Sequence, residues 1–104
     1  MQAETKANKA LVLDFTKRIL QERDLEKLDG FVADDIDQHA APIGAGRRGM
    51  AEWLTSKEAG AYETLFQLIG QGDFALTYGK RHAIGKNIAV FNAYRVSDGK
   101  IAEH

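Results

Sequence analysis

The chain has 104 residues, of which 44% are hydrophobic and one is proline, a composition that fits one compact domain with a modest core. Fourteen basic and fifteen acidic residues leave a net charge of -1, and this balance excludes the charge pattern of a nucleic-acid-binding protein or a polybasic membrane contact. The chain has no cysteine, hence no disulfide framework or thiolate site. Since it shows neither a signal-peptide pattern nor an apolar run of ~20 residues, we expect a soluble cytoplasmic protein.

The first third of the chain is predicted to be helical. Apolar residues recur every three or four positions from about Lys6 to Arg23, which indicates an amphipathic helix. Asp24 is placed to cap a short second helix over Leu25 to Val32. A brief extended piece is expected from Ile36 to Ala40.

The rest of the chain is predicted to hold one more helix and a meander of strands. A glycine-rich loop over Gly44 to Gly49 precedes a third helix from Met50 to Ala59. Short turns of hairpin length separate the strand-like runs that follow, namely Tyr62 to Ile69, Phe74 to Ile84, Ile88 to Val96 and Lys100 to His104. This order predicts an α+β fold in which three N-terminal helices pack on one face of a curved antiparallel sheet.

One face of the third strand run is apolar except for a single amide. Period-two alternation puts on this face the residues Ile88, Val90, Asn92, Tyr94 and Val96. A buried amide needs hydrogen-bond partners or a ligand. Asn92 therefore either lines a pocket or satisfies backbone groups at a bend of the sheet, and the sequence leaves both interpretations open.

Several short motifs occur in an order that is typical of a known family. They are Ala33-Asp34-Asp35, Gln38-His39, Phe91-Asn92-Ala93-Tyr94-Arg95 and Asp98-Gly99-Lys100-Ile101-Ala102-Glu103-His104. Over nearly its whole length the chain resembles the SnoaL-like polyketide cyclase family, part of the nuclear transport factor two-like superfamily that also includes ketosteroid isomerase. The resemblance implies one SnoaL-like domain over residues 1–104, a cone-shaped sheet around an apolar pocket, and a homodimer through the outer face of the sheet.

The chain departs from this family in two places. SnoaL-like chains usually carry aspartate at the position of Asn92, and they continue beyond the pair that here is Glu103 and His104. We therefore expect a domain that is short at its C-terminus, with a pocket that is more open, completed by a neighbouring subunit, or no longer catalytic.

The resemblance to ketosteroid isomerase nominates two catalytic residues. His39 lies near the position of the carboxylate that shuttles a proton, and imidazole suits proton transfer near neutral pH. Asn92 takes the place of a protonated aspartic acid that bonds the oxyanion, and its NH₂ group can donate the same bond. His39 can equally be a surface histidine that bonds nearby backbone, and the sequence does not separate these alternatives.

Five more residues are candidates for ligand binding: Thr16, Trp53, Tyr78, His82 and His104. Thr16 aligns with the tyrosine donor of ketosteroid isomerase. The ring of Tyr78 can line a cavity while its hydroxyl donates to a ligand. Trp53 and His82 have structural roles as simple alternatives, as core and as surface residues. His104 alternates with Ala102 and so can face the interior of the cone.

The other classes of site have little support. The three histidines lie on separate predicted elements without a metal-ligand spacing, so we expect no metal site, and proton chemistry in an apolar pocket requires no cofactor.

One hypothesis is an enzyme that binds a small hydrophobic carbonyl compound and catalyses cyclisation, isomerisation or dehydration. The alternative is a non-catalytic ligand-binding or dimeric assembly module of the same fold. Apolar residues on both faces of the run from Tyr62 to Ile69 favour self-association.

Overall fold

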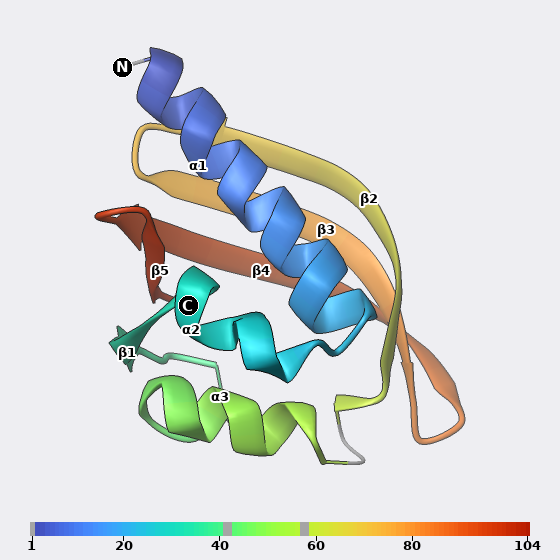
Figure 1. Cartoon of the computed structure of the whole chain (residues 1–104). Helices are drawn as coiled ribbons and strands as arrows, with labels where there is room; N and C mark the ends of the chain where they lie inside the picture. The colour runs from blue at the N-terminus through green and yellow to red at the C-terminus, as the bar shows by residue number, and fades with distance from the viewer. Residues whose placement is uncertain (1, 41–42, 57–58) are drawn as a thin grey trace.

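The computed structural model describes residues 2–40, 43–56 and 59–104. Three helical segments and five strands follow one another along the chain (Figure 1). The helical segments are α1 (Gln2–Phe15) with its π-helical extension η1 (Thr16–Gln21), the 3₁₀ turn η2 (Leu25–Lys27) with α2 (Leu28–Phe31), and α3 (Gly46–Leu54). The strands are β1 (Val32–Asp37), β2 (Ala61–Gln71), β3 (Phe74–Ala83), β4 (Lys86–Ser97) and β5 (Lys100–Glu103).

The strands form one curved, open sheet in the order β1-β5-β4-β3-β2. Strands β2 to β5 make the expected antiparallel meander, but β1 pairs with β5 in parallel, so the sheet is mixed. The prediction of a purely antiparallel sheet is wrong at this edge, because β1 comes from the helical half of the chain and β5 returns beside it from the meander. The α+β fold with three helices is confirmed.

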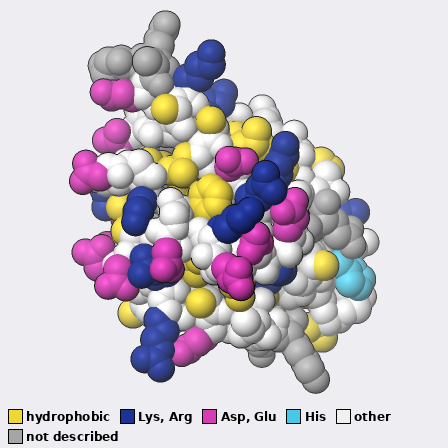
Figure 2. All heavy atoms as spheres, viewed as in Figure 1, with side chains coloured by type: hydrophobic (Ala, Val, Ile, Leu, Met, Phe, Trp, Pro, Cys, Tyr) yellow, Lys and Arg dark blue, Asp and Glu magenta, His cyan; other side chains and the backbone are white. Residues whose placement is uncertain are grey.

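The helices cover the concave face of the sheet, with α1 running diagonally across the long strands (Figure 1). The core between these layers contains Val12, Phe15, Ile19, Leu28, Val32, Ile36, Met50, Leu54, Ala75, Tyr94, Val96 and Ile101. Gly70 allows α1 to approach β2 closely, because a Cβ at this position would lie 2.3 Å from Cγ of Lys9. The helical face carries interspersed basic and acidic side chains (Figure 2).

The third helix begins earlier than predicted. Its first four residues belong to the stretch that was expected to be a glycine-rich loop. A Cβ on Gly49 would lie 2.2 Å from the carbonyl carbon of Gly44, so this glycine serves close packing inside a helix. The helix also ends at Leu54 instead of Ala59, and residues 57–58 of the expected helix lie outside the described part of the chain.

Strand β3 turns its small residues toward the helices. Ala75 has 0% exposure and Thr77 3%, whereas Leu76 is 51% exposed. In β4 the predicted alternation is confirmed, because Tyr94 and Val96 are buried on the inner face and Phe91 faces outward.

Among the described residues, no helix has the length and apolar character needed to span a membrane.

Candidate functional site

A cavity of about 150 Å³ opens between the helices and the inner face of the sheet. Helix α3 and strand β4 contribute the most residues to its wall, and the connecting segments, α1, η1, β3 and the residue after β5 contribute the others. The apolar lining consists of Phe15, Leu20, Ala40, Ile43, Met50, Trp53, Leu54, Ala59, Val90 and Tyr94. Four polar side chains complete the lining, namely Arg23, Arg81, Asn92 and His104.

Asn92 and His104 form a hydrogen-bonded pair in this wall. Nε2 of His104 donates to Oδ1 of Asn92 at 2.9 Å, since a carbonyl oxygen can only accept. The imidazole also stacks on the ring of Tyr94, with centroids 4.9 Å apart and planes 10° apart. The backbone of His104 is held as well, because its N–H donates to Asp37 O and its carbonyl accepts from His39 N–H. The pair is therefore fixed in position before any ligand arrives.

The surroundings keep the His104 imidazole neutral. Burial, and after it the electrostatic effect of the nearby His39, lower its pKa from 6.5 to about 4. With the proton on Nε2, the other ring nitrogen is an acceptor. This Nδ1 atom is buried and has no hydrogen-bond partner among the residues that the structure describes. The pair thus presents an amide donor on Asn92 and a neutral ring on His104.

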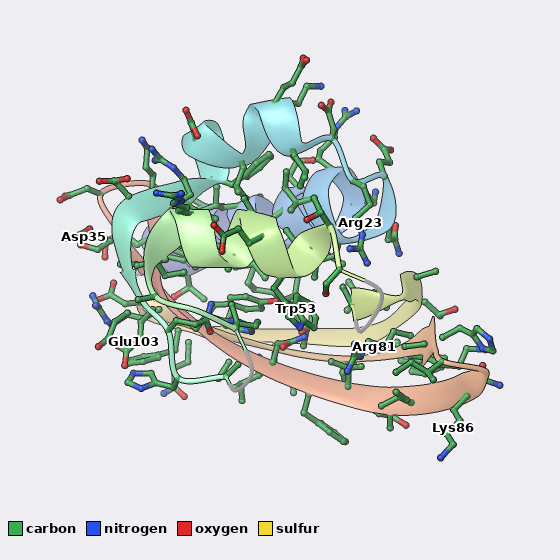
Figure 3. All side chains as sticks on the ribbon, turned by 90° about the horizontal axis from the view of Figure 1, so that it is seen from below. Arg23, Asp35, Trp53, Arg81, Lys86 and Glu103 are labelled. Carbon is green, nitrogen blue, oxygen red and sulfur yellow. The ribbon has the colours of Figure 1, made fainter. Side chains whose placement is uncertain are left out.

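Two arginines and a tryptophan border the other part of the cavity (Figure 3). Arg23 has a positive φ of 59° and donates to the carbonyl oxygens of Leu20, Leu54 and Gly60. Burial lowers the pKa of Arg23, and the charge of Arg81 lowers it further. The Arg81 guanidinium lies 5.4 Å from the centre of the Trp53 ring and donates to the carbonyl of Ala59. These contacts connect η1, α3 and β3 around the cavity.

His39 lies outside the cavity, on the surface beside the end of β5. Its side chain is 61% exposed, and Nε2 lies 2.6 Å from Glu103 Oε2 and 3.5 Å from Asp37 Oδ2. The other oxygen of Glu103 accepts a hydrogen bond of 2.8 Å from Arg95. The pKa of the Glu103 carboxyl is lowered first by its bond to Arg95 and then by its bond to His39. The structure therefore separates His39 from Asn92, although the resemblance paired them as catalytic residues.

The remaining candidates fall on different sides of the sheet. Thr16 is buried, and its hydroxyl donates to the carbonyl of Val12 at 2.9 Å. Tyr78 lies on the outer face of β3, where its ring stacks on Phe91. His82 is also exposed, and its Nδ1 bonds the side chain of Asn87. Of the seven predicted site residues, only Trp53, Asn92 and His104 line the cavity.

Sequence reasoning missed the two arginines of the cavity. Arg81 lies by period-two alternation on the same face of β3 as the small inner residues, and this alternation was the signal that could have identified it. The opposite face, which carries Tyr78, was expected to line the pocket instead. Arg23 carried no such signal, because two of its carbonyl acceptors, on Leu54 and Gly60, come within reach only in the folded chain.

Comparison with protein-family models and with curated proteins gives no match. Solved structures match over most of the chain. A ketosteroid isomerase-like protein from Kribbella flavida has 17% identity and a TM-score of 0.83, covering 96% of this chain and 76% of that one. An NTF2-like protein of unknown function from Cytophaga hutchinsonii has 18% identity and a TM-score of 0.75, covering 92% and 84%. A SnoaL-like polyketide cyclase from Agrobacterium tumefaciens has 14% identity and a TM-score of 0.71, covering 89% and 84%.

The chain has the NTF2-like fold. The fold predicted from the SnoaL-like resemblance is thereby confirmed. Because each identity is below 25%, the likeness to these NTF2-like structures extends to the fold alone.

Proposed function

We propose that this NTF2-like chain binds a small, largely apolar carbonyl compound, with the NH₂ group of Asn92 donating to the carbonyl oxygen. The Asn92–His104 pair inside an otherwise mostly apolar wall carries this proposal. The Oδ1 atom of Asn92 accepts a hydrogen bond from His104, so the NH₂ group of the same amide is the part that we propose donates to a ligand. A few placed polar groups in an apolar cavity are typical of small-molecule sites.

The size of the cavity limits the ligand. A cavity of about 150 Å³ is the size that accepts benzene in an engineered protein, and it is smaller than the usual range for drug-sized ligands. A single-ring ketone fits this volume better than a steroid or a fused polycyclic polyketide does. The ligand class is therefore a compact carbonyl compound.

The placement of the histidines favours binding over proton transfer. His39 lies outside the cavity lining, and the pKa of His104, lowered to about 4, makes its ring a weak base at neutral pH. Cyclisation, isomerisation or dehydration all need a group that removes a proton near the carbonyl. We therefore propose a ligand-binding protein, and treat an enzyme as the competing outcome.

A matched pair of ligands tests the binding proposal. Isothermal titration with cyclohexanone and with its hydrocarbon isostere methylenecyclohexane should give tighter binding of the ketone. Asn92→Leu should weaken ketone binding by roughly tenfold, the value of one hydrogen bond, and leave hydrocarbon binding unchanged. The control Asn87→Leu removes an exposed amide elsewhere on β4 and should change neither affinity. Equal affinities of the two ligands for the wild type would contradict the proposal.

Hydrogen exchange of the ketone tests the competing enzyme function. If the chain removes a proton next to the carbonyl, cyclohexanone in D₂O should exchange its α-protons faster in its presence. We expect no protein-dependent exchange. Exchange that disappears in His39→Ala or in His104→Gln would instead establish proton transfer and name its base.

The outer face of the sheet supports a second proposal, a homodimer through this face. The exposed large apolar residues on this face, here called the outer patch, are Phe66, Ile69, Phe74, Leu76, Tyr78 and Phe91. The Tyr78 ring contacts the rings of Phe66 and Phe91, with centroids 5.2 Å and 4.7 Å apart. A contiguous apolar surface of this kind is typical of a protein interface.

Sedimentation at micromolar protein concentration tests this dimer. The wild type should sediment as a dimer, and Phe91→Lys, which places a charge in the outer patch, should sediment as a monomer. Ile84→Lys is the matched control, since Ile84 is also 75% exposed but lies in the turn between β3 and β4. A wild type of monomeric mass would contradict the proposal.

A further inference from the structure

Three side chains with metal-binding donor atoms meet where β1 ends beside β5. Asp37 is the last residue of β1, His39 follows two positions later, and Glu103 is the last residue of β5. One donor atom from each of the three lies within 4.8 Å of the other two. One imidazole nitrogen and two carboxylate oxygens form a mixed set of the kind that binds divalent transition ions.

We propose that Asp37, His39 and Glu103 bind a divalent transition-metal ion such as Zn²⁺, with His39 Nε2 and one oxygen of each carboxylate as ligands. Water completes the coordination, because the side chains of His39 and Asp37 are exposed and that of Glu103 is partly exposed. The spacing of the three histidines in the sequence predicted no metal site, because this spacing does not reveal that two carboxylates meet His39 in the fold.

The backbone holds Asp37 and Glu103 on neighbouring strands and ties His39, just after β1, to the same pairing. Asp37 and Glu103 are register partners in the parallel pairing of β1 with β5. Two backbone hydrogen bonds continue this pairing beyond the strand ends, from His39 N–H to His104 O at 2.7 Å and from His104 N–H to Asp37 O at 3.0 Å. Ligands on paired strands keep their relative positions better than ligands on a loop do.

A neighbouring residue orients one of the carboxylates. Arg95 Nε donates to Oε1 of Glu103 at 2.8 Å, which leaves Oε2 directed at His39 Nε2, 2.6 Å away. Outer partners that fix a ligating carboxylate in this way are a regular feature of metal sites. On metal binding the ion would take the place of the direct contact between His39 Nε2 and Glu103 Oε2.

The bound ion would join the edge strand β1 to β5. Glu103 lies at the end of the molecule opposite Lys86, the first residue of β4 (Figure 3). None of the three ligands is among the residues that line the cavity. The metal proposal is therefore independent of the carbonyl-binding proposal, and it predicts a higher melting temperature in the presence of the ion.

Zn²⁺ titration of untagged protein tests the site. Isothermal titration should show one Zn²⁺ per chain in the wild type, and His39→Ala should weaken the affinity at least tenfold. Glu103→Gln and Asp37→Asn should weaken it as well, and both keep the shape of the side chain. His82→Ala removes an exposed histidine that bonds Asn87 on another part of the sheet, so it is the matched control and should bind Zn²⁺ like the wild type.

Two results would overturn the metal site. One is the absence of Zn²⁺ binding to the wild type, which would leave the three residues as an ion-pair cluster. The other is an unchanged affinity in His39→Ala together with a reduced affinity in His82→Ala, which would place the ion at a different histidine. A rise in melting temperature with Zn²⁺ that occurs in the wild type and in His82→Ala, but not in Glu103→Gln, would support the site.

Discussion

The two faces of the central strands carry opposite patterns of side-chain size. On the inner face of β3, Ala75, Thr77 and Gly79 are small and buried, while on the outer face Leu76 and Tyr78 are large and exposed. The inner residues are small because the helices pack closely against this strand. The outer residues have no helix above them in the described part of the chain. Alternating hydrophobicity therefore locates two faces of a strand but does not tell which one meets the core.

The largest expected difference between the two faces is in the cost of losing an aromatic ring. Tyr94 is 2% exposed and contacts the ring of Phe15, whereas Phe91 is 75% exposed. Tyr94→Ala should lower the free energy of unfolding by about 3–5 kcal/mol, because it leaves a cavity in the core. Phe91→Ala should lower it by less than about 1 kcal/mol in dilute protein. Urea unfolding of both variants checks this, and similar losses would mean that the outer patch is already covered in the monomer.

Acid should weaken the inner face through His104. Its pKa falls from 6.5 in the unfolded chain to about 4 in the folded one, so the unfolded state binds the proton more readily between these values. Stability should be unaffected by this group above pH 6.5 and should decrease as the pH falls toward 4, by about 2 kcal/mol at pH 5. Unfolding free energies measured from pH 7 to pH 5 should show this loss in the wild type. His104→Gln should remove it, and an equal loss in that variant would assign the effect to other groups.

Two buried threonines should respond in opposite directions. The hydroxyl of Thr16 donates to Val12 O, whereas the hydroxyl of Thr77 is buried without a hydrogen-bond partner among the described residues. Thr16→Val should cost about 1 kcal/mol, the net value of a hydrogen bond. Thr77→Val should be neutral or should stabilise the fold by up to about 1 kcal/mol, since it removes an unsatisfied polar group. Thermal unfolding of both variants measures this contrast, and a clear loss in Thr77→Val would show that its hydroxyl has a partner in solution.

The smallest effect is expected for the outer-face histidine. His82 is exposed and bonds only a neighbouring exposed amide among the contacts described for it. His82→Ala should change the free energy of unfolding by less than about 0.5 kcal/mol at pH 7. Urea unfolding at pH 7 checks this value. A larger loss would show that the outer face near β3 is covered by a partner or has a second structural role.

The chain order of the helices and the meander could be predicted from local patterns. The 3.6-residue period of the first helix and the period-two alternation around Asn92 depend only on neighbouring residues, so the α+β class and the inner position of this amide were both found. The boundaries near Gly49 and the face of β3 were not found. The start of α3 depends on how closely the preceding segment folds back on the helix, as the contact between Gly49 and Gly44 shows, and the face of β3 depends on how closely the helices approach the sheet.

The sequence by itself determined the elements, their order, and the amide that lies in the cavity wall. Only the tertiary structure decided the roles of the histidines. Antiparallel pairing of β4 with β5 brings His104 to Asn92. Parallel pairing of β1 with β5 places His39 outside the cavity, beside Asp37 and beside Glu103, which is 64 positions away along the chain. The physical reason is that periodicity records the environment of each strand separately, while the pairing of distant strands is set by how the whole sheet packs on its helices.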